Sequence, residues 1–313
     1  MKILITDKIH PIFFDSLRGC GCDLDYLPES NQSDILEIVH QYEGLIINSK
    51  SRADRVLIDK AVRLRFIARM GSGMEIIDQE YARQKGIVCI NSPEGNCDAV
   101  AEYAVGALIA LMRNIHSAHA EVKRAIWQRE KNRGTELGGK VIGIYGYGHT
   151  GSAFARRLNG FGVTVLAYDK YKSGFSDNYI KESSPEEIFL NADVLSLHLP
   201  LSEETRYLAD YAFFTRFKKN IWVINTARGQ HIKTSDLIRA VREGKVVAAA
   251  LDVLENENLN TLDAQQKAWF DDLVAEQRIL LTPHIAGLTQ ESFRKIAEVL
   301  AAKIQKLLPA LQK

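Results

Sequence analysis

Short apolar runs alternate with stretches of helical spacing along nearly all of this chain. The runs that read as strands are KILIT, GLIIN, RFIAR and GIVCI before residue 91, and VIGIY, VTVLAY, DVLSLHL, IWVIN, VVAAALDV and RILLTP after residue 139. These runs are continuously apolar, which is typical of parallel strands covered on both faces. Strand and helix patterns that alternate in this way predict an α/β fold.

Two of the helical stretches stand out by their length. The first, Asp98–Asn114, contains the apolar segment AVAEYAVGALIALM, which Glu102 interrupts. This segment is shorter than the ~20 residues that cross a bilayer, so we interpret it as a buried helix that crosses between two domains. The second, Thr289–Leu308, has apolar residues at helical spacing and is expected to return to the N-terminal domain.

A glycine motif follows the run GKVIGIY. GYGHTG, Gly146–Gly151, fits the pattern G-x-G-x-x-G, and a helical stretch and a second apolar run come after it. Asp169 ends that second run, 18 residues beyond Gly151, close to the spacing of a carboxylate that binds the adenosine ribose. The amides at the helix start would hold the phosphates. The alternative, a glycine-rich loop without a ligand, leaves Asp169 unexplained.

The position of the glycine motif predicts the domain organisation. Such a turn normally follows the first strand of a nucleotide-binding domain, but here it lies near the middle of the chain. We therefore predict a dinucleotide-binding domain over residues 98–284, inserted into a smaller α/β domain made of residues 1–97 and 285–313.

Composition narrows the functional classes. The 313 residues are 46% hydrophobic, and 40 basic against 39 acidic residues leave a net charge of +1, which gives no reason to expect a nucleic-acid partner. No segment predicts a membrane span or a signal peptide. The four cysteines include the pair Cys20 and Cys22, which could bind a metal or act in redox chemistry. Since no second Cys/His cluster completes a site, we expect reduced thiols in a cytoplasmic protein and no metal.

Three strand ends after the glycine motif carry polar residues suited to catalysis. Arg228 follows IWVINTA and could grip a carboxylate, although a surface arginine would look the same. Asp252 ends the next run, with Glu255 and Glu257 just beyond, which could equally be a solvated acidic turn. His284 follows LLTP, and histidine is the side chain best suited to exchange a proton near neutral pH, although a lone histidine is more often structural. Together they form a candidate acid/base set.

Several segments, in order along nearly the whole chain, resemble the D-isomer-specific 2-hydroxyacid dehydrogenase family. They are RMGSGMEIID, NSPEGNCDAVAEYAVG, GTELGGKVIGIYGYGHTG, NTARG, ALDVLENE and LTPHIAGLT. The resemblance implies a Rossmann-type NAD-binding domain inserted in a flavodoxin-like substrate-binding domain. It also implies NAD as cofactor, a 2-hydroxy or 2-oxo acid as substrate, and a homodimer formed through the NAD-binding domains.

The same resemblance assigns roles to individual residues. Arg228 would bind the substrate carboxylate, and His284 would be the acid/base. The partner of His284 would be Glu257 rather than Glu255, because the family's acid lies five residues beyond the aspartate that corresponds to Asp252. The chain departs from the family at the next position, where Asn258 replaces the usual proline. The cofactor residues would be Gly146, Gly148, His149, Thr150, Gly151, Asp169, His198, Leu199, Pro200, Thr226, Ala227, Asp252 and Gly287, with Asp252 near the nicotinamide amide. The substrate residues would be Ser49, Lys50, Ser72, Gly73, Met74 and Arg228.

The resemblance leaves the substrate open. The loop NSKSRAD, Asn48–Asp54, combines Lys50 and Arg52 with two serines, which suits a phosphate and favours 3-phosphoglycerate/phosphohydroxypyruvate, a reaction of serine biosynthesis. Glyoxylate or hydroxypyruvate reduction and a D-lactate-type reaction are the alternatives, as is a solvated polar loop. A non-catalytic NAD(H)-sensing scaffold is the alternative of another class. Formate dehydrogenase fits poorly, because such relatives carry glutamine at the position of Glu257.

Overall fold

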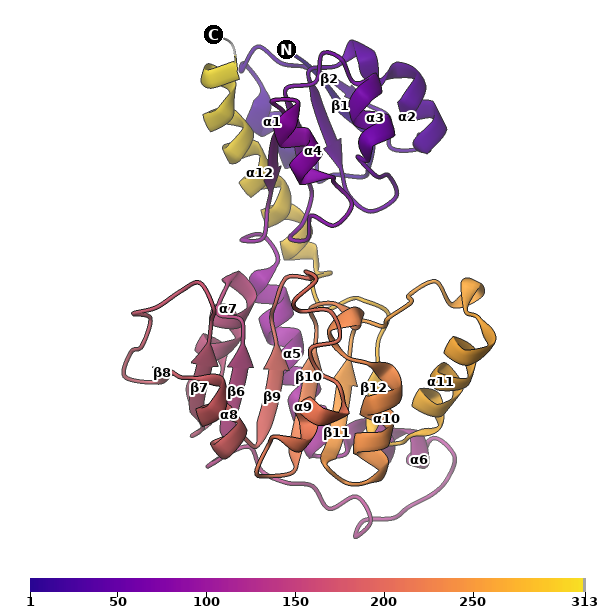
Figure 1. Cartoon of the computed structure of the whole chain (residues 1–313), viewed down its shortest axis with the longest axis vertical. Helices are drawn as coiled ribbons and strands as arrows, with labels where there is room; N and C mark the ends of the chain where they lie inside the picture. Colours follow the sequence, from indigo (N-terminus) through magenta and orange to yellow (C-terminus); the bar gives the residue numbers. More distant parts are fainter. Residues whose placement is uncertain (312–313) are drawn as a thin grey trace. The chain divides into compact units, whose positions relative to one another are not determined.

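The computed structural model describes residues 1–311, which form two compact units (Figure 1). The first unit comprises Met1–Cys97 and the C-terminal segment that begins at Leu288, and the second comprises Asp98–Gly287. Both are α/β units built on parallel sheets, so the predicted fold class is confirmed.

The first unit contains a five-stranded parallel sheet in the order β2-β1-β3-β4-β5, which is the flavodoxin-like order. Its strands are β1 (Lys2–Ile5), β2 (Asp23–Tyr26), β3 (Gly44–Ile47), β4 (Phe66–Arg69) and β5 (Val88–Asn91). Its helices are α1 (Ile12–Leu17), α2 (Gln32–Ile38), the short 3-10 helix η1 (Val39–Gln41), α3 (Arg55–Lys60), α4 (Gln79–Gln84) and α12 (Gln290–Leu311).

The last helix completes the core of this first unit. On one face of the sheet, Phe13 of α1 packs in a cluster with Leu300 and Ile304 of α12. A Cβ at Gly95 would lie 2.6 Å from the Cα of Ile296, so the loop after β5 meets the backbone of α12 directly and only glycine fits there. The other face is covered by the apolar residues of α2, α3 and α4.

The second unit contains a seven-stranded parallel sheet in the order β12-β11-β10-β9-β6-β7-β8, which is the Rossmann order extended by one strand. Its strands are β6 (Val141–Tyr145), β7 (Thr164–Tyr168), β8 (Ile180–Glu182), β9 (Val194–Leu197), β10 (Ile221–Asn225), β11 (Val246–Leu251) and β12 (Ile279–Leu281). Its helices are α5 (Cys97–Met112), α6 (Ile115–Val122), α7 (His149–Arg157), α8 (Pro185–Asn191), α9 (Tyr211–Thr215), α10 (Thr234–Arg242) and α11 (Ala264–Ala275), with the 3-10 turns η2 (Gly229–His231) and η3 (Leu259–Thr261).

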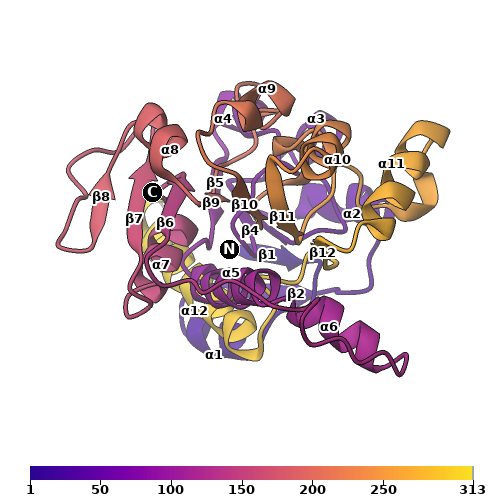
Figure 2. The same ribbon diagram turned by 90° about the horizontal axis from the view of Figure 1, so that it is seen from below.

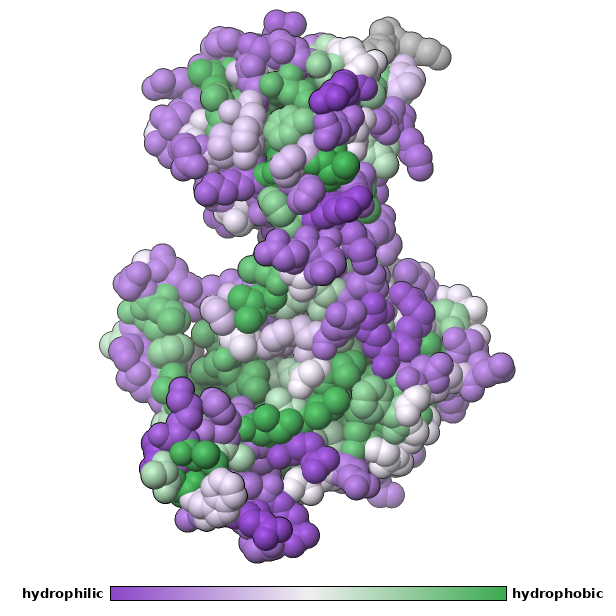
Figure 3. Space-filling view, turned by 180° about the vertical axis from the view of Figure 1, so that it is seen from behind, coloured by the Kyte–Doolittle hydropathy of each residue, from purple (hydrophilic) through white to green (hydrophobic). Residues whose placement is uncertain are grey.

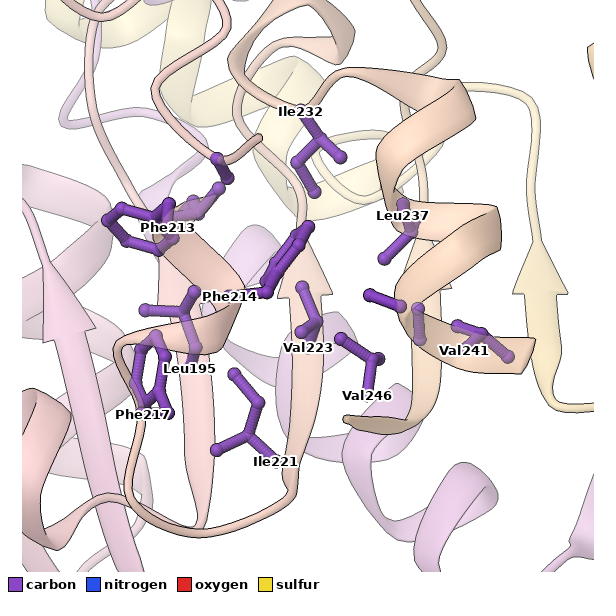
Figure 4. Packing of buried hydrophobic residues seen from close by; sticks show 14 of the residues in the cluster. Leu195, Phe213, Phe214, Phe217, Ile221, Val223, Ile232, Leu237, Val241 and Val246 are labelled. Carbon is purple, nitrogen blue, oxygen red and sulfur yellow. The ribbon is translucent and has the colours of Figure 1, made fainter. Parts of the chain in front are cut away.

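Helices cover both faces of this second sheet. Figure 2 shows α5 along one face and α8, α9 and α10 on the opposite face. Figure 4 shows the second of these interfaces, where Phe214 of α9 and Leu237 of α10 pack over Val223 of β10 and Val246 of β11. The continuous apolar runs of the sequence are explained by this two-sided cover, because both faces of each central strand are buried.

The sequence pattern missed a few elements. Strands β2 and β8 lie at sheet edges, and β2 (DLDY) is half-exposed, so neither carries an apolar run. All four cysteines are free thiols. None of the helices within residues 1–311 is both long and apolar enough to cross a membrane.

Candidate active and cofactor-binding site

The glycine motif forms the turn between β6 and α7. Gly146 has a φ of 95°, a conformation that favours glycine, and a Cβ at Gly151 would collide with the carbonyl oxygen of Gly146. Gly148 is the N-cap of α7, and no atom lies within 4 Å of the place where its Cβ would be. Gly146 and Gly151 therefore allow the tight turn, while Gly148 leaves open space at the start of a helix, beside His149 and Thr150.

Asp169 faces this turn from the end of β7. Its Oδ2 accepts a hydrogen bond from the amide of Tyr147 at 2.7 Å, and its Oδ1 accepts from the amides of Tyr171 and Lys172 at 2.9 and 3.1 Å. The carboxylate is only half-buried, so its remaining lone pairs can still accept a hydroxyl. The neighbouring Lys170 ammonium pairs with the carboxylate of Glu204 at 2.6 Å.

His198, which follows β9, packs against the glycine turn. The residue is 7% exposed, the centroid of its ring lies 5.4 Å from that of Phe154, and its Nε2 lies 2.8 Å from the hydroxyl of Ser196. Burial lowers the pKa of His198 to about 4, so the ring is neutral near pH 7. Its backbone carbonyl and the side chain of Leu199 both lie against Gly146. The side chain is therefore part of the core, and contact with a cofactor would come from the backbone here and at Pro200.

The residues of the glycine turn and of the β10 end fit a dinucleotide. The first amides of α7 have no intrahelical acceptor and can hold an anion, as at any helix start. Within residues 1–311, the hydroxyl of Thr226, next to Ala227, is buried and has no hydrogen-bond partner. Buried polar atoms are normally hydrogen-bonded, and a bound ligand is one way to give this hydroxyl a partner. The open space at Gly148, the Asp169 carboxylate and the Thr226 hydroxyl together match what NAD requires.

Arg228 begins the short turn η2 after β10. Asn225 holds this turn, because its amide nitrogen donates to the carbonyl of Arg228 at 2.9 Å and its oxygen accepts from the amide of Ala227 at 3.1 Å. A Cβ at Gly229 would collide with the backbone of Leu254, so the η2 turn packs directly on the segment after β11. The guanidinium donates to the carbonyl of Ala227 at 2.6 Å, and Arg228 is half-buried.

Asp252 organises the turn that follows β12. It is 1% exposed, and its Oδ1 accepts from the hydroxyl of Thr282 at 2.6 Å and from the amide of Ile285 at 2.9 Å. Its Oδ2 accepts from the amide of Ala286 at 2.7 Å, and its backbone carbonyl accepts from the amide of His284 at 2.8 Å. The carboxylate thus serves the protein's own backbone first, and its role toward a nicotinamide amide stays a prediction. Gly287 ends this unit.

The structure brings Glu257 to His284. The Nδ1 of His284 lies 3.0 Å from the Oε2 of Glu257, and both side chains are 46% exposed. Glu255 binds elsewhere, because its Oε1 accepts from the amide of Thr234 at the start of α10, 2.6 Å away. Of the two candidate glutamates, Glu257 is the one that contacts the histidine.

The predicted substrate loop of the first unit is tied to the segment after β5. Ser72 donates through its hydroxyl to Asn96 at 2.8 Å, and its carbonyl accepts from the Asn91 amide at 2.6 Å. Gly71, at φ 138°, donates through its amide to the Ser92 hydroxyl. These bonds hold the backbone at Gly71 and Ser72, and the next residues, Gly73 and Met74, are both half-buried.

The loop after β3 differs from the expectation of two serine hydroxyls beside two cations. Ser49 is exposed, but Ser51 is fully buried, and the Lys50 ammonium binds the carbonyl of Pro28. Lys50 lines a cavity of about 450 Å³ together with Asp7, Lys8, Pro28, Glu29, Ser30, Asn31, Gln32 and Asn48. The cavity holds two carboxylates as well as two ammonium groups, so it is less favourable to an anion than the loop sequence alone indicated.

Two contributors to the site were missed by sequence reasoning. Thr282 and Asn225 hold Asp252 and Arg228 through hydrogen bonds, yet neither had been singled out. The sequence offers one signal for them: Asn225 ends the strand before Arg228, and Thr282 follows the strand before His284. The described part of the chain holds no group of three or more His, Cys, Asp or Glu side chains arranged for a metal ion.

Comparison with known proteins identifies the family and the cofactor. Residues 105–286 match the NAD binding domain of D-isomer specific 2-hydroxyacid dehydrogenases, which confirms the predicted cofactor. The chain is 32% identical to a D-3-phosphoglycerate dehydrogenase of Methanocaldococcus jannaschii, over 98% of this chain and 57% of that protein. It therefore spans little more than half the length of the phosphoglycerate dehydrogenases that it matches.

Two further relatives are covered almost fully. A hydroxypyruvate reductase of Thermotoga maritima is 33% identical over 88% of each chain. The crystal structure of a glyoxylate reductase from Paecilomyes thermophila superposes with a TM-score of 0.86 at 25% identity, covering 98% of this chain and 95% of that one. Since the family match spans more than half of its residues, this chain belongs to the D-isomer specific 2-hydroxyacid dehydrogenase family.

Proposed function

We propose that this protein catalyses NAD-dependent hydride transfer between nicotinamide and C2 of a D-2-hydroxy acid or its 2-oxo acid. The observation that carries the proposal is the contact between His284 and Glu257, at 3.0 Å, on the rim of an NAD binding domain. Arg228 follows the strand β10, which is next to β11 in the same sheet. An acid/base, its carboxylate partner and a carboxylate-binding guanidinium are the groups that this reaction needs.

The roles of the side chains follow from their contacts. NADH, when bound, supplies the hydride. Glu257 faces Nδ1 of His284, which leaves Nε2 as the nitrogen that exchanges a proton with the substrate oxygen. During reduction, protonated His284 donates that proton, and in the reverse direction neutral His284 removes it. Arg228 binds the substrate carboxylate and stabilises the negative charge that develops on the carbonyl oxygen.

For the substrate we propose 3-phosphoglycerate/phosphohydroxypyruvate, with hydroxypyruvate or glyoxylate next and a D-lactate-type reaction after them. Lys50 and Arg52 support a phosphate, and Ser49, Ser72, Gly73 and Met74 are proposed as further substrate contacts. Asp7 and Glu29 near Lys50 weigh in the other direction, because they would repel a dianion. The relatives described above include both phosphoglycerate dehydrogenases and a hydroxypyruvate reductase.

A substrate panel tests this proposal. Phosphohydroxypyruvate, hydroxypyruvate, glyoxylate and pyruvate are each supplied with NADH and with NADPH, and loss of nicotinamide absorbance is followed. A bound phosphate predicts a higher kcat/KM for phosphohydroxypyruvate than for hydroxypyruvate. That preference should shrink in the double variant Lys50→Ala/Arg52→Ala and remain in the control Lys60→Ala/Arg63→Ala, which removes two exposed cations beyond this loop. Equal use of both substrates by the parent rules out a phosphate site, and no turnover at all rules out the reaction.

We also propose a homodimer formed through the NAD-binding units, in a cytoplasmic protein. Helix α5 supports the dimer: Val105 and Ile109 are only partly buried, and Gly106 is exposed. Figure 3 shows apolar side chains gathered on the side of this unit where α5 lies. Light scattering should give twice the chain mass of 35.1 kDa for the parent and a lower mass for Val105→Glu. A monomer mass for the parent at micromolar concentration contradicts the dimer.

A further inference from the structure

The backbone at His284 has a conformation that needs support. Its φ is 55°, in the left-handed region that residues with a Cβ rarely adopt. Three consecutive amides, those of His284, Ile285 and Ala286, donate to Asp252, the first to its carbonyl and the other two to its carboxylate. A single buried aspartate therefore holds the turn that presents the imidazole.

The fourth donor to Asp252 connects this turn to a distant helix. The hydroxyl of Thr282 donates to Asp252 Oδ1 at 2.6 Å, and the same hydroxyl is in contact with the hydroxyl of Tyr103 on α5. An ionised carboxylate only accepts, so the single proton of Thr282 points to Asp252. The Thr282 oxygen must then accept from Tyr103, which fixes the direction of the chain as Tyr103 to Thr282 to Asp252.

The surroundings keep Tyr103 in the donating form. Burial raises the pKa of the Tyr103 phenol above its usual value, and it outweighs the hydrogen bond with Thr282, which acts to lower that pKa; the nearby Asp252 charge adds to the rise. The hydroxyl is therefore protonated at any working pH. Hydrogen bonds aligned in one direction reinforce each other, so a Tyr103 donor strengthens the bond from Thr282 to the carboxylate.

Helix α5 is itself fixed to the nucleotide-binding half of the unit. Arg157, at the end of α7, pairs with Asp98 at 2.9 Å and with Glu102 at 3.3 Å, and Glu102 is the neighbour of Tyr103. The glycine-turn helix and the His284 turn thus have α5 as a common support.

We propose that Tyr103 is a positioning residue for His284 and acts through Thr282 and Asp252. The proposal rests on the proposed function only for the catalytic consequence, since the support of the turn is a property of the fold. It predicts that loss of the Tyr103 hydroxyl loosens the backbone of residues 282–287 and slows proton transfer, without weakening NADH binding.

The test compares four variants. Tyr103→Phe removes the first donor, Thr282→Val removes the link, and Thr282→Ser keeps the hydroxyl. Tyr211→Phe is the control, because it removes a tyrosine hydroxyl whose partner, the carboxylate of Glu243, lies away from this turn. Amide hydrogen exchange of a peptide covering residues 282–287, kcat, the Kd for NADH and Tm are measured for each.

Tyr103→Phe should raise the exchange rate of residues 282–287 and lower kcat by about three- to tenfold, the scale of one neutral hydrogen bond. Thr282→Val should lower kcat by about 10- to 100-fold, since a donor to a buried charge is lost. Thr282→Ser should stay within about threefold of the parent, and the Kd for NADH should change by less than about twofold throughout.

Two outcomes overturn the proposal. In the first, Tyr103→Phe gives exchange and kcat equal to those of Tyr211→Phe. In the second, Thr282→Ser loses as much as Thr282→Val, which would assign the effect to packing of the methyl group. A parent that turns over no 2-oxo acid contradicts the proposed function instead, and hydrogen exchange then decides the role of Tyr103 by itself.

Discussion

The carboxyl-terminal rim of the seven-stranded sheet has two halves, and they are built in different ways. In the half formed by β6, β7 and β9, the backbone makes most of the contacts: glycines shape the turn, and Asp169 binds three backbone amides. In the half formed by β10, β11 and β12, side chains from separate segments are brought together, as when Glu257 meets His284.

His198 and His284, one in each half of the rim, illustrate the difference between the two halves. His198, in the nucleotide half, is buried against Phe154 and stays neutral, so it can only support the turn. His284, in the other half, is 46% exposed and has a carboxylate beside its Nδ1. The same side chain is a core residue in one half and an acid/base candidate in the other, and the environment decides which.

The sharpest test of this difference is His284→Asn, since asparagine tolerates the left-handed backbone at this position better than alanine. We expect kcat to fall by ~10² or more, the usual scale for a lost acid/base group, with the Kd for NADH unchanged. Steady-state kinetics and fluorescence titration measure the two quantities. The exposed histidine variant His119→Asn serves as control, and turnover of His284→Asn within a few-fold of it would remove His284 from the mechanism.

Alanine at the two neighbouring glutamates separates chemistry from structure. Glu257→Ala should lower kcat by about tenfold, because the ring of His284 loses the carboxylate beside its Nδ1 and is held less firmly. Glu255→Ala should leave kcat nearly unchanged but lower the free energy of unfolding by about 1–2 kcal/mol, since its carboxylate bonds the amide of Thr234. Thermal denaturation and steady-state kinetics are measured for both variants. A loss of kcat in Glu255→Ala together with a parent-like kcat in Glu257→Ala would make Glu255 the partner of His284.

In the nucleotide half, Asp169→Asn keeps an oxygen for the amide of Tyr147 but removes the charge. A carboxylate repels a 2′-phosphate, so the preference for NADH over NADPH should narrow by roughly five- to tenfold, the scale of one unit charge at contact distance in water. The Kd values for both cofactors measure this. The control Asp177→Asn, on the loop after β7, should leave the ratio of the NADH and NADPH Kd values unchanged. If Asp169→Asn also leaves that ratio unchanged, Asp169 is not at the ribose.

His198 should affect stability more than turnover. The pKa of His198 is about 4 in the folded chain and about 6.5 in the unfolded chain. Between pH 4 and pH 6.5, the unfolded chain therefore binds a proton that the folded chain does not. The contribution of His198 to stability is therefore present above pH 6.5 and is lost as pH falls toward 4, by up to about 3 kcal/mol. Urea unfolding of the parent and of His198→Gln at about pH 7, 6 and 5 measures it. Parallel pH dependences for the two proteins would contradict the buried, neutral ring.

The fold was predictable from sequence where one local pattern sufficed. The apolar run VIGIY became β6 and the stretch Thr289–Leu308 became most of α12, because burial on both faces or on one helical stripe leaves a local signature. The edge strand β2 was not predicted, because its sequence DLDY is half-exposed and carries no apolar run.

The site was predictable in its residues but not in their contacts. Position after a strand identified Arg228, Asp252 and His284, because parallel strands end on the same rim. The same rule could not show that the carboxylate of Asp252 is already engaged by Thr282 and two backbone amides, since those partners lie 30 or more residues away in the sequence. Nor could it show the positive φ of His284, which depends on that engagement.

The C-terminal helix α12 has a consequence for how the chain is made. Gln305 of α12 bonds the carbonyl of Ser16, 289 residues earlier, and Ala297, Leu300 and Ile304 cover one face of the first sheet. At ~5–20 residues per second, a ribosome needs roughly 10 to 40 s to add the intervening second unit. Throughout that interval the apolar side chains of β1 and α1 lack their cover, while the nucleotide-binding unit can already complete its core. Of the two units, we therefore expect the one synthesised earlier to complete its core later, and its uncovered apolar face to be the more prone to aggregation in the nascent chain.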